Sequence, residues 1–219
     1  MSDDDIYEMQ RRTLVNELYS RGDIRSQGVR SAMLSVPREH FVPALLKRES
    51  YLDRPLPIGK GQTISAPHMV AIMADEMDAG PGQKVLEIGT GSGYHAAVVS
   101  RLIVPGGHVY TVERLSSLVR SSRENLSRAG IDNVTVVEGD GSIGFRDSAP
   151  YDRIYYTCAA PDVPSTVLEQ LAEGGLILAV VGPKSGVQRL VRLRKKGGRM
   201  IEERLTHCVF VPLIGELGY

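Results

Sequence analysis

The stretch Val85-Leu86-Glu87-Ile88-Gly89-Thr90-Gly91-Ser92-Gly93 decides the fold of this chain. A short apolar run leads directly into three glycines at alternate positions, and a helical apolar pattern begins at Tyr94. This order predicts a buried strand, a tight turn and a helix. Glycines in such a turn let the backbone approach a ligand closely, where a Cβ would collide. The stretch therefore predicts a ligand-binding crossover of an α/β fold.

The same alternation of strand and helix continues toward the C-terminus. The expected strands lie near Lys84–Ile88, His108–Val112, Val134–Glu138, Arg153–Thr157 and Leu176–Val181. The expected helices lie at Tyr94–Leu102, Leu115–Ala129 and Pro164–Ala172. Such alternation implies parallel pairing in a doubly wound sheet. Two further strands, about Gln188–Arg194 and Ile201–Val211, are separated by a glycine-containing turn, so we expect a hairpin that adds an antiparallel strand to this mostly parallel sheet.

The first 80 residues follow a different pattern, which predicts helices and one functional loop. One helix is expected to stop at Gly22, a second at Pro37, and a third to begin near Ser65. The segment 51–62 is rich in proline and glycine, and a loop of that length is more often functional than idle. We expect a single domain over 1–219, in which 1–80 form an N-terminal helical addition with a substrate loop. Residues 81–219 then form the cofactor-binding core and its C-terminal strands.

Composition narrows the class of protein. The 219 residues contain 26 Lys plus Arg and 26 Asp plus Glu, so the net charge is zero. This balance gives no electrostatic reason to expect nucleic acid or a membrane as partner. The basic stretch 189–199 would suit RNA, but no aromatic residue interleaves it, and strand edges commonly carry such charge. Two cysteines and five scattered histidines predict neither a disulfide framework nor a metal site. An acidic start without an apolar run predicts a cytoplasmic protein, and we expect a monomer.

Acidic residues at the ends of successive predicted strands identify the cofactor. The spacing is G-x-G-x-G, not the G-x-G-x-x-G of pyrophosphate sites. An anion at Glu87 would repel a pyrophosphate, but it suits the positively charged amino acid part of S-adenosylmethionine. Glu113 ends the second predicted strand, where a carboxylate can accept both ribose hydroxyls, and Asp140 follows the third, where it can accept from adenine. Each acid alone could be a turn or helix-end residue, but their coincidence favours S-adenosylmethionine, with S-adenosylhomocysteine as product. The candidate cofactor-binding residues are Glu87, Gly89, Thr90, Gly91, Gly93, Glu113, Asp140 and Gly141.

The methyl acceptor is indicated first by motifs that the sequence lacks. Enzymes that methylate base amines often carry Asn/Asp-Pro-Pro-Tyr/Phe after the fourth strand, where this chain reads Thr157-Cys158-Ala159-Ala160-Pro161. The Pro-Cys pair of pyrimidine C5 chemistry is also missing. Both nucleobase classes are therefore disfavoured.

The segment Pro55-Leu56-Pro57-Ile58-Gly59-Lys60-Gly61-Gln62-Thr63-Ile64-Ser65 carries a specific resemblance. Together with Ser35-Val36-Pro37-Arg38-Glu39-His40-Phe41-Val42-Pro43 it closely resembles the protein-L-isoaspartate O-methyltransferases, and the likeness runs from about residue 5 to Pro212. The resemblance implies transfer of a methyl group to the free carboxylate of L-isoaspartyl residues in damaged proteins, which initiates repair. Isoaspartyl peptides and proteins would then be the partners.

The resemblance also implies roles for particular residues. It makes Ser65 the active-site residue, whereas Ser65 before Ala66-Pro67 would on sequence alone be an N-cap of the third helix. A carboxylate is already anionic at neutral pH, so such an enzyme needs no general base and acts by positioning. The candidate substrate-binding residues are Gln62, Thr63, Ile64, Ser65 and Val209. Around Val209 the sequence departs from the family pattern, which puts peptide preference in question.

Two other classes compete with this interpretation. An NAD-dependent oxidoreductase predicts G-x-G-x-x-G and a proton-transfer residue. A non-catalytic S-adenosylmethionine-binding or protein-interaction module would tolerate loss of the segment Gln62–Ser65, which is intact here.

Overall fold

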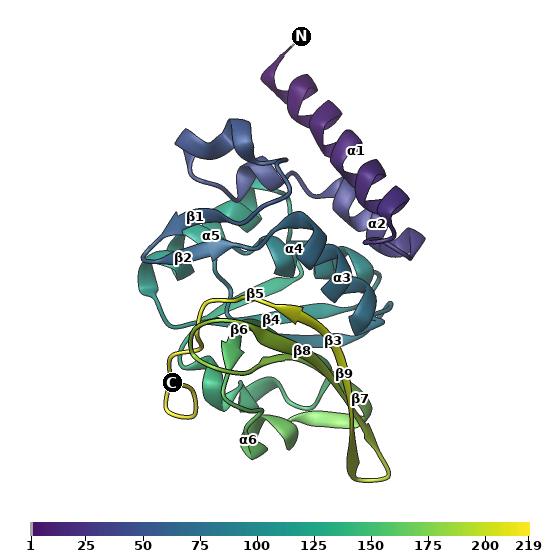
Figure 1. The fold of residues 1–219 in the computed structure, drawn as a ribbon, viewed down its shortest axis with the longest axis vertical. Coiled ribbons are helices and arrows are strands. Elements are labelled where there is room, and N and C mark those ends of the chain that lie inside the picture. The colour runs from purple at the N-terminus through teal and green to yellow at the C-terminus, as the bar shows by residue number, and fades with distance from the viewer. Residues whose placement is uncertain (1) are drawn as a thin grey trace.

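The sheet at the centre of the molecule has seven strands in the order β5-β4-β3-β6-β7-β8-β9 (Figure 1). The computed structural model describes residues 2–219. The strands are β3 (Lys84–Ile88), β4 (His108–Glu113), β5 (Val134–Glu138), β6 (Tyr151–Ala160), β7 (Leu171–Val181), β8 (Gln188–Lys196) and β9 (Arg199–Cys208). Strands β3 to β7 pair in parallel, whereas β8 and β9 are antiparallel. The predicted doubly wound sheet with an antiparallel C-terminal addition is confirmed.

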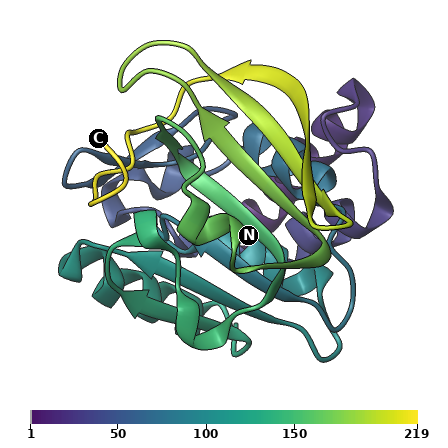
Figure 2. The same cartoon turned by 90° about the horizontal axis from the view of Figure 1, so that it is seen from below.

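The order of the strands reverses at β3. From β3 the chain builds outward through β4 to β5, and then returns to place β6 on the other side of β3. Figure 2 shows the two resulting edges, with the teal strands at one and the green and yellow strands at the other. A reversal of this kind opens a crevice at the carboxyl ends of the central strands, where doubly wound folds bind ligands.

Helices cover the two faces of the sheet unequally. On one face lie α3 (Pro67–Met77), α4 (Tyr94–Leu102) and α5 (Ser116–Arg128), with Met73 and Val99 packed on the strand residues Val85 and Val109. On the other face lies α6 (Ser165–Leu168), where Val167 packs against Ile154 and Ile177. Apolar side chains point to alternate sides of each strand and so pack against the helices on both faces of the sheet.

The helix expected over 164–172 is wrong in length, because α6 is a single turn. Leu171 pairs with Tyr151 as the start of β7 instead of extending the helix. The Gln170 side chain donates to the carbonyl oxygens of Ile143 and Thr166, which anchors the chain as it enters the strand. The apolar spacing of Val167 and Leu171 suits a helix, but pairing with β6 overrides that local preference.

The N-terminal segment forms a helical layer outside α4. Helix α1 (Asp3–Arg21) begins with a capping box between Ser2 and Asp5, and it ends at Gly22 in a left-handed conformation. Helix α2 (Gln27–Ser35) follows, and two 3-10 helices span Arg38–His40 and Ala44–Glu49. Buried residues of α1 and α2, among them Leu18 and Met33, pack with Val98 of α4. Within residues 2–219, the structure contains no helix that is both long and apolar enough to cross a bilayer.

The expected substrate loop contains a β-hairpin. Strands β1 (Leu56–Gly59) and β2 (Gln62–Ile64) pair antiparallel, and the turn between them places Lys60 and Gly61 at positive φ. Figure 1 shows this hairpin beside the helical layer, apart from the main sheet. Helix α3 follows it directly, with Ala66 at the N-cap position and no side chain capping it. The alternative role of Ser65 as an N-cap is therefore wrong.

Candidate active site

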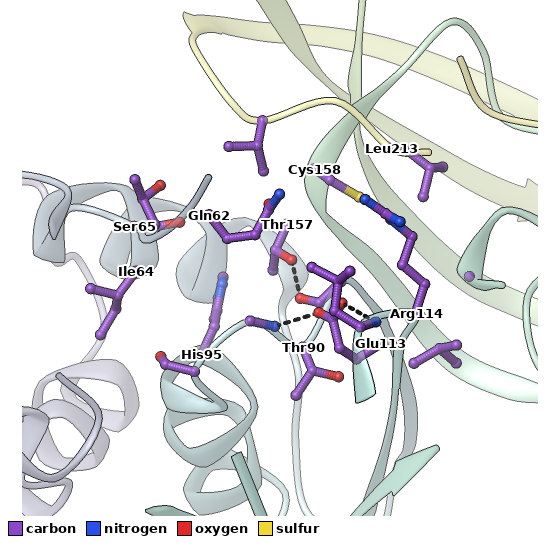
Figure 3. Close-up of a pocket in the computed structure, with 18 of the residues that line it drawn as sticks. Gln62, Ile64, Ser65, Thr90, His95, Glu113, Arg114, Thr157, Cys158 and Leu213 are labelled. Atoms are coloured by element: carbon purple, nitrogen blue, oxygen red, sulfur yellow. Dashed lines mark hydrogen bonds between the residues drawn. The ribbon is translucent and has the colours of Figure 1, made fainter. Parts of the chain in front are cut away.

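A cavity opens at the carboxyl ends of β3, β4 and β6, where the strand order reverses. It encloses about 780 Å³, counting the part open to solvent. Its wall comes mainly from five stretches of chain that are far apart in sequence, 62–65, 89–95 without Gly93, 112–115, 157–158 and 211–214, together with Val70 and Gly141. Figure 3 shows Ile64 and Ser65 on one side of this cavity and Glu113 and Arg114 on the other. The mixture of polar and apolar groups in this wall suits a small organic ligand.

The glycine-rich loop adopts the conformation that its sequence predicts. Gly89 has φ 99°, and a Cβ built on it would lie 2.6 Å from Thr157 Oγ1. Gly93 has φ 87° and forms the N-cap of α4, outside the cavity wall itself. Gly89, Thr90 and Gly91 line the cavity, so the loop exposes backbone where bulky side chains would fill the space.

Glu113 is buried at the end of β4 and fastens the glycine-rich loop. One carboxylate oxygen accepts from the Gly91 N–H at 3.0 Å, and the other accepts from the Leu115 N–H at 3.0 Å. Each oxygen keeps a further lone pair, because an ionised carboxylate offers about four acceptor sites. The carboxylate lines the cavity and can therefore accept from neighbouring hydroxyl groups of a ligand.

Glu87 lies beneath the loop and does not line the cavity, although its position in the sequence suggested a direct ligand contact. Its side chain is fully buried and accepts from the hydroxyls of Thr111 and Tyr155, the latter at 2.8 Å. Burial raises the pKa of Glu87 to about 8, while these hydrogen bonds act in the opposite direction. Thr111 is also 2.7 Å from the hydroxyl of Thr90, which faces the cavity. Glu87 thus reaches the cavity wall only through intermediate side chains.

Asp140 is already engaged by other parts of the chain. Its carboxylate accepts from the backbone N–H groups of Ser142 at 2.8 Å and Glu216 at 2.7 Å. Burial disfavours the anion, but the hydrogen bonds from Glu216 and Ser142 lower the pKa of Asp140 below its ordinary value. The neighbouring Gly141 lines the cavity, whereas Asp140 does not. The loop 139–142 is therefore tied to the C-terminal segment of the chain.

The predicted substrate segment lies on the other side of the cavity. Gln62, Thr63, Ile64 and Ser65 all line it, with Ile64 buried and Thr63 exposed. Val209 stands apart, 72% exposed and outside the cavity wall. The segments 62–65 and 89–91 therefore line the same cavity.

Several wall residues were missed by the sequence analysis. His95 follows the glycine-rich loop in α4, and Arg114 and Leu115 follow Glu113 directly. Their position next to a motif already identified is the sequence signal that could have indicated these three wall residues. The segment 211–214 reaches the cavity because it pairs with β6, where the Ala159 N–H donates to the Val211 carbonyl at 2.8 Å. Nothing local in the sequence indicates that pairing.

Two kinds of chemistry lack the groups they need here. Burial raises the pKa of the Cys158 thiol far above its ordinary value, so this wall residue is a poor nucleophile. Across residues 2–219 no three His, Cys, Asp or Glu side chains gather as a metal site would require.

The fold, with a glycine-rich loop and a strand-end carboxylate at the cavity, is that of a methyltransferase that uses S-adenosylmethionine. Residues 9–218 match the family model described as protein-L-isoaspartate(D-aspartate) O-methyltransferase. The chain therefore belongs to the protein-L-isoaspartate O-methyltransferase family.

Curated relatives support this membership over nearly the whole chain. The protein-L-isoaspartate O-methyltransferase of Methanothermobacter thermautotrophicus is 51% identical over 96% of this chain and 97% of its own length. That of Methanopyrus kandleri is 50% identical over 99% of this chain and 96% of its own length.

Solved structures with the same description share the fold. One protein-L-isoaspartate O-methyltransferase superposes with a TM-score of 0.87 at 32% identity, covering 95% of this chain and 67% of the other. A Plasmodium falciparum protein of that description, crystallised with S-adenosylhomocysteine, superposes with a TM-score of 0.81 at 28% identity, covering 93% and 98%.

Proposed function

We propose that this chain methylates the free carboxylate of L-isoaspartyl residues at the cavity between the glycine-rich loop and the segment Gln62–Ser65. The observation that carries the proposal is that these two segments, with Ser65 and Glu113 on opposite walls, line one cavity. Family membership supplies the reaction, and the arrangement of the cavity wall supports the roles proposed for its residues.

The residues of the donor side fit S-adenosylmethionine. Absent side chains at Gly89 and Gly91 leave room against the backbone, and Glu113 presents a carboxylate for the two ribose hydroxyls. Gly141 and Leu115 form the wall nearer the expected adenine end. When bound, S-adenosylmethionine supplies a methyl group made electrophilic by its sulfonium. Asp140 supports this wall by holding the loop, and Glu87 supports it through Thr111 and Thr90.

The acceptor side has to orient an anion and does not have to create one. At pH 7, a carboxyl group with a pKa of about 4 has roughly a thousandfold more of its anion than of its protonated form. The Ser65 hydroxyl donates to one carboxylate oxygen and leaves the other free to attack the methyl group in line. A neutral hydroxyl orients the carboxylate without the quenching that a close cation would cause. Gln62, Thr63 and Ile64 shape the rest of this wall.

The protein substrate approaches from the open side of the cavity. The exposed Thr63 and Val209 lie where residues flanking the isoaspartate would pass, with Val209 contributing its backbone. We further place the enzyme in the cytoplasm as a monomer that acts as a single domain. Its two cysteines, Cys158 and Cys208, are both free, which suits a reducing compartment.

The test uses labelled S-adenosylmethionine with two peptides that differ only in isoaspartate or aspartate at one position. We expect base-labile label on the isoaspartyl peptide alone, because a carboxyl methyl ester hydrolyses in base. Equal labelling of both peptides, or none, would overturn the proposal. Calorimetric titration with S-adenosylhomocysteine and with NAD separates this function from an oxidoreductase, and only the former is expected to bind.

A further inference from the structure

Asp53 is a carboxylate outside the cavity wall that accepts hydrogen bonds from distant parts of the chain. One oxygen accepts from the His68 backbone N–H at 2.9 Å and lies 2.8 Å from Nδ1 of the same residue. The other oxygen accepts from the guanidinium of Arg21, the last residue of α1, at 2.6 Å. Burial disfavours the anion, but the hydrogen bonds from Arg21 and His68 lower the pKa of Asp53 below its ordinary value. Asp53 is therefore ionised at neutral pH, and it acts only as an acceptor.

The bond from His68 completes the start of α3, which the residues at that end of the helix leave without a cap. The first N–H groups of a helix have no intrahelical acceptor. Ala66 at the N-cap position has no polar side chain, and Pro67 has no N–H, so His68 carries the first of these donors. Asp53 accepts from it in place of an N-cap side chain, from 15 residues away in the sequence. The Asp53 carboxylate thus fixes the position at which α3 begins.

The start of α3 lies next to Ser65 along the chain. Two residues separate Ser65 from His68 on one side. On the other side Ser65 follows Ile64, which is buried and pairs with Leu56 across the hairpin β1–β2. Ser65 therefore lies between two fixed points, the hairpin before it and the contact of Asp53 with His68 after it. The direction of the Ser65 hydroxyl depends on both.

Methyl transfer in line makes the direction of this hydroxyl matter. On the proposed function, the Ser65 hydroxyl holds one oxygen of the acceptor carboxylate so that the other faces the methyl group. An error of about 1 Å in such an arrangement can cost about 100-fold in rate. We propose that Asp53 is a positioning residue for methyl transfer, which holds the start of α3 through the His68 N–H and so keeps the Ser65 hydroxyl in its productive orientation. The inference rests on the proposed function.

The test compares Asp53→Ala with Asp75→Ala, a matched change at the opposite end of α3. Asp75 is also half-buried, and it accepts from the backbone N–H groups of Arg25 at 2.6 Å and Ser26 at 3.2 Å. Because each variant loses hydrogen bonds to backbone N–H groups, both should lower the melting temperature, by about 2–8 °C. Only Asp53→Ala should lower kcat for an isoaspartyl peptide, by about 10- to 100-fold.

Two further measurements separate positioning from a general weakening of the fold. The affinity of Asp53→Ala for S-adenosylhomocysteine should stay within about twofold of the wild type, because the donor side of the cavity is intact. The KM for the peptide should change far less than kcat, since the orientation of the carboxylate matters most in the transition state. Asp53→Asn keeps an oxygen that can accept from the His68 N–H, so it should recover most of the kcat that Asp53→Ala loses.

Removal of the Ser65 hydroxyl shows whether Asp53 acts through it. In a Ser65→Ala background, Asp53→Ala should lower kcat by less than about threefold, because the hydroxyl that it orients is gone. Independent losses that multiply would overturn the inference. An equal loss of kcat in Asp75→Ala, an unchanged kcat in Asp53→Ala, or a kcat of Asp53→Asn as low as that of Asp53→Ala would also overturn it. A wild type that does not methylate the isoaspartyl peptide is a failure of the proposed function, which is distinct from all of these.

Discussion

The backbone N–H of Gly91 donates to the Glu113 carboxylate across 3.0 Å, which ties the glycine-rich loop after β3 to the end of β4. The same carboxylate accepts from the Leu115 N–H at the start of α5. One side chain thus holds both backbone segments that border the donor side of the cavity through hydrogen bonds within the protein. Such preorganisation lowers the entropy that binding must overcome.

Removing this carboxylate should weaken donor binding. We expect Glu113→Ala to lower the affinity for S-adenosylhomocysteine roughly 10- to 100-fold, because the ribose acceptor and the loop anchor are lost together. Glu138 ends the neighbouring strand β5, is exposed and lies outside the cavity, so Glu138→Ala is the matched control. Calorimetry measures both variants. An affinity of Glu113→Ala equal to that of the control would exclude a direct role for Glu113.

Ser65 should affect turnover far more than stability. The hydroxyl does not cap α3, so Ser65→Ala is expected to leave the melting temperature unchanged within about 1 °C. Losing one hydrogen bond to a carboxylate should lower kcat/KM for an isoaspartyl peptide about 10- to 100-fold. Steady-state kinetics and thermal unfolding check the two halves separately. A lower melting temperature with intact turnover would contradict the assignment of Ser65 to the acceptor side.

Glu87 should make the stability of the protein depend on pH. Its folded-state pKa of about 8 lies above its ordinary value. The protonated side chain therefore contributes fully to the stability of the fold in acid, and this contribution is lost as the pH rises toward 8. The variant Glu87→Gln keeps the shape of the side chain but cannot ionise, and it should gain stability relative to the wild type by about 3–5 kcal/mol between pH 4 and pH 8. Urea unfolding at several pH values measures the difference.

The exposed residue Glu124 provides the control for that experiment, since Glu124→Gln removes a carboxylate that solvent surrounds. Any pH dependence that both variants share would not come from the burial of Glu87. A stability difference for Glu87→Gln that does not change with pH would show that Glu87 stays ionised in the folded protein.

Asp140 should hold the C-terminal segment against the cavity. The Glu216 N–H donates to the Asp140 carboxylate, so we expect Asp140→Ala to speed amide hydrogen exchange at Glu216. The same change should weaken binding of S-adenosylhomocysteine by about tenfold. Asp162→Ala is the control, because the Asp162 residue is exposed and its carboxylate accepts from the adjacent Val163 N–H. Weaker binding with unchanged exchange at Glu216 would instead favour the direct adenine contact that the sequence suggested for Asp140.

Strands β3 to β7 were predictable because each contains a local apolar run followed by a turn signal, whereas β8 and β9 were indicated by the glycine-containing turn between them. The hairpin β1–β2 was not, since its strands are very short and Pro57 within the first argues against a strand. Helix α6 was predicted too long because Leu171 fits a helical spacing, and only its pairing with Tyr151 reveals a strand. Local patterns thus identified most elements, and tertiary pairing decided the exceptions.

Some residues of the candidate site were also predictable from local sequence, whereas others were not. The glycine-rich loop and Glu113 follow from position at strand ends, whose carboxyl edges meet in a parallel sheet. Strand alternation explains Glu87, which shares a side of β3 with Val85 beneath α4 and so points under the loop. His95 and the segment 211–214 become wall residues only through packing of distant elements. No local pattern distinguishes them from ordinary helix and loop residues.

Because Val211–Leu213 pair with Ala159, the cavity wall is built from two parts of the chain that a single break could separate. The loop 183–187 between β7 and β8 is exposed, and every wall residue up to Cys158 precedes it, while 211–214 follow it. A break in this loop would yield two fragments, each with an incomplete wall. Their reassociation would rebuild the donor site, so the fold offers a natural division for a split reporter whose signal depends on the ligand.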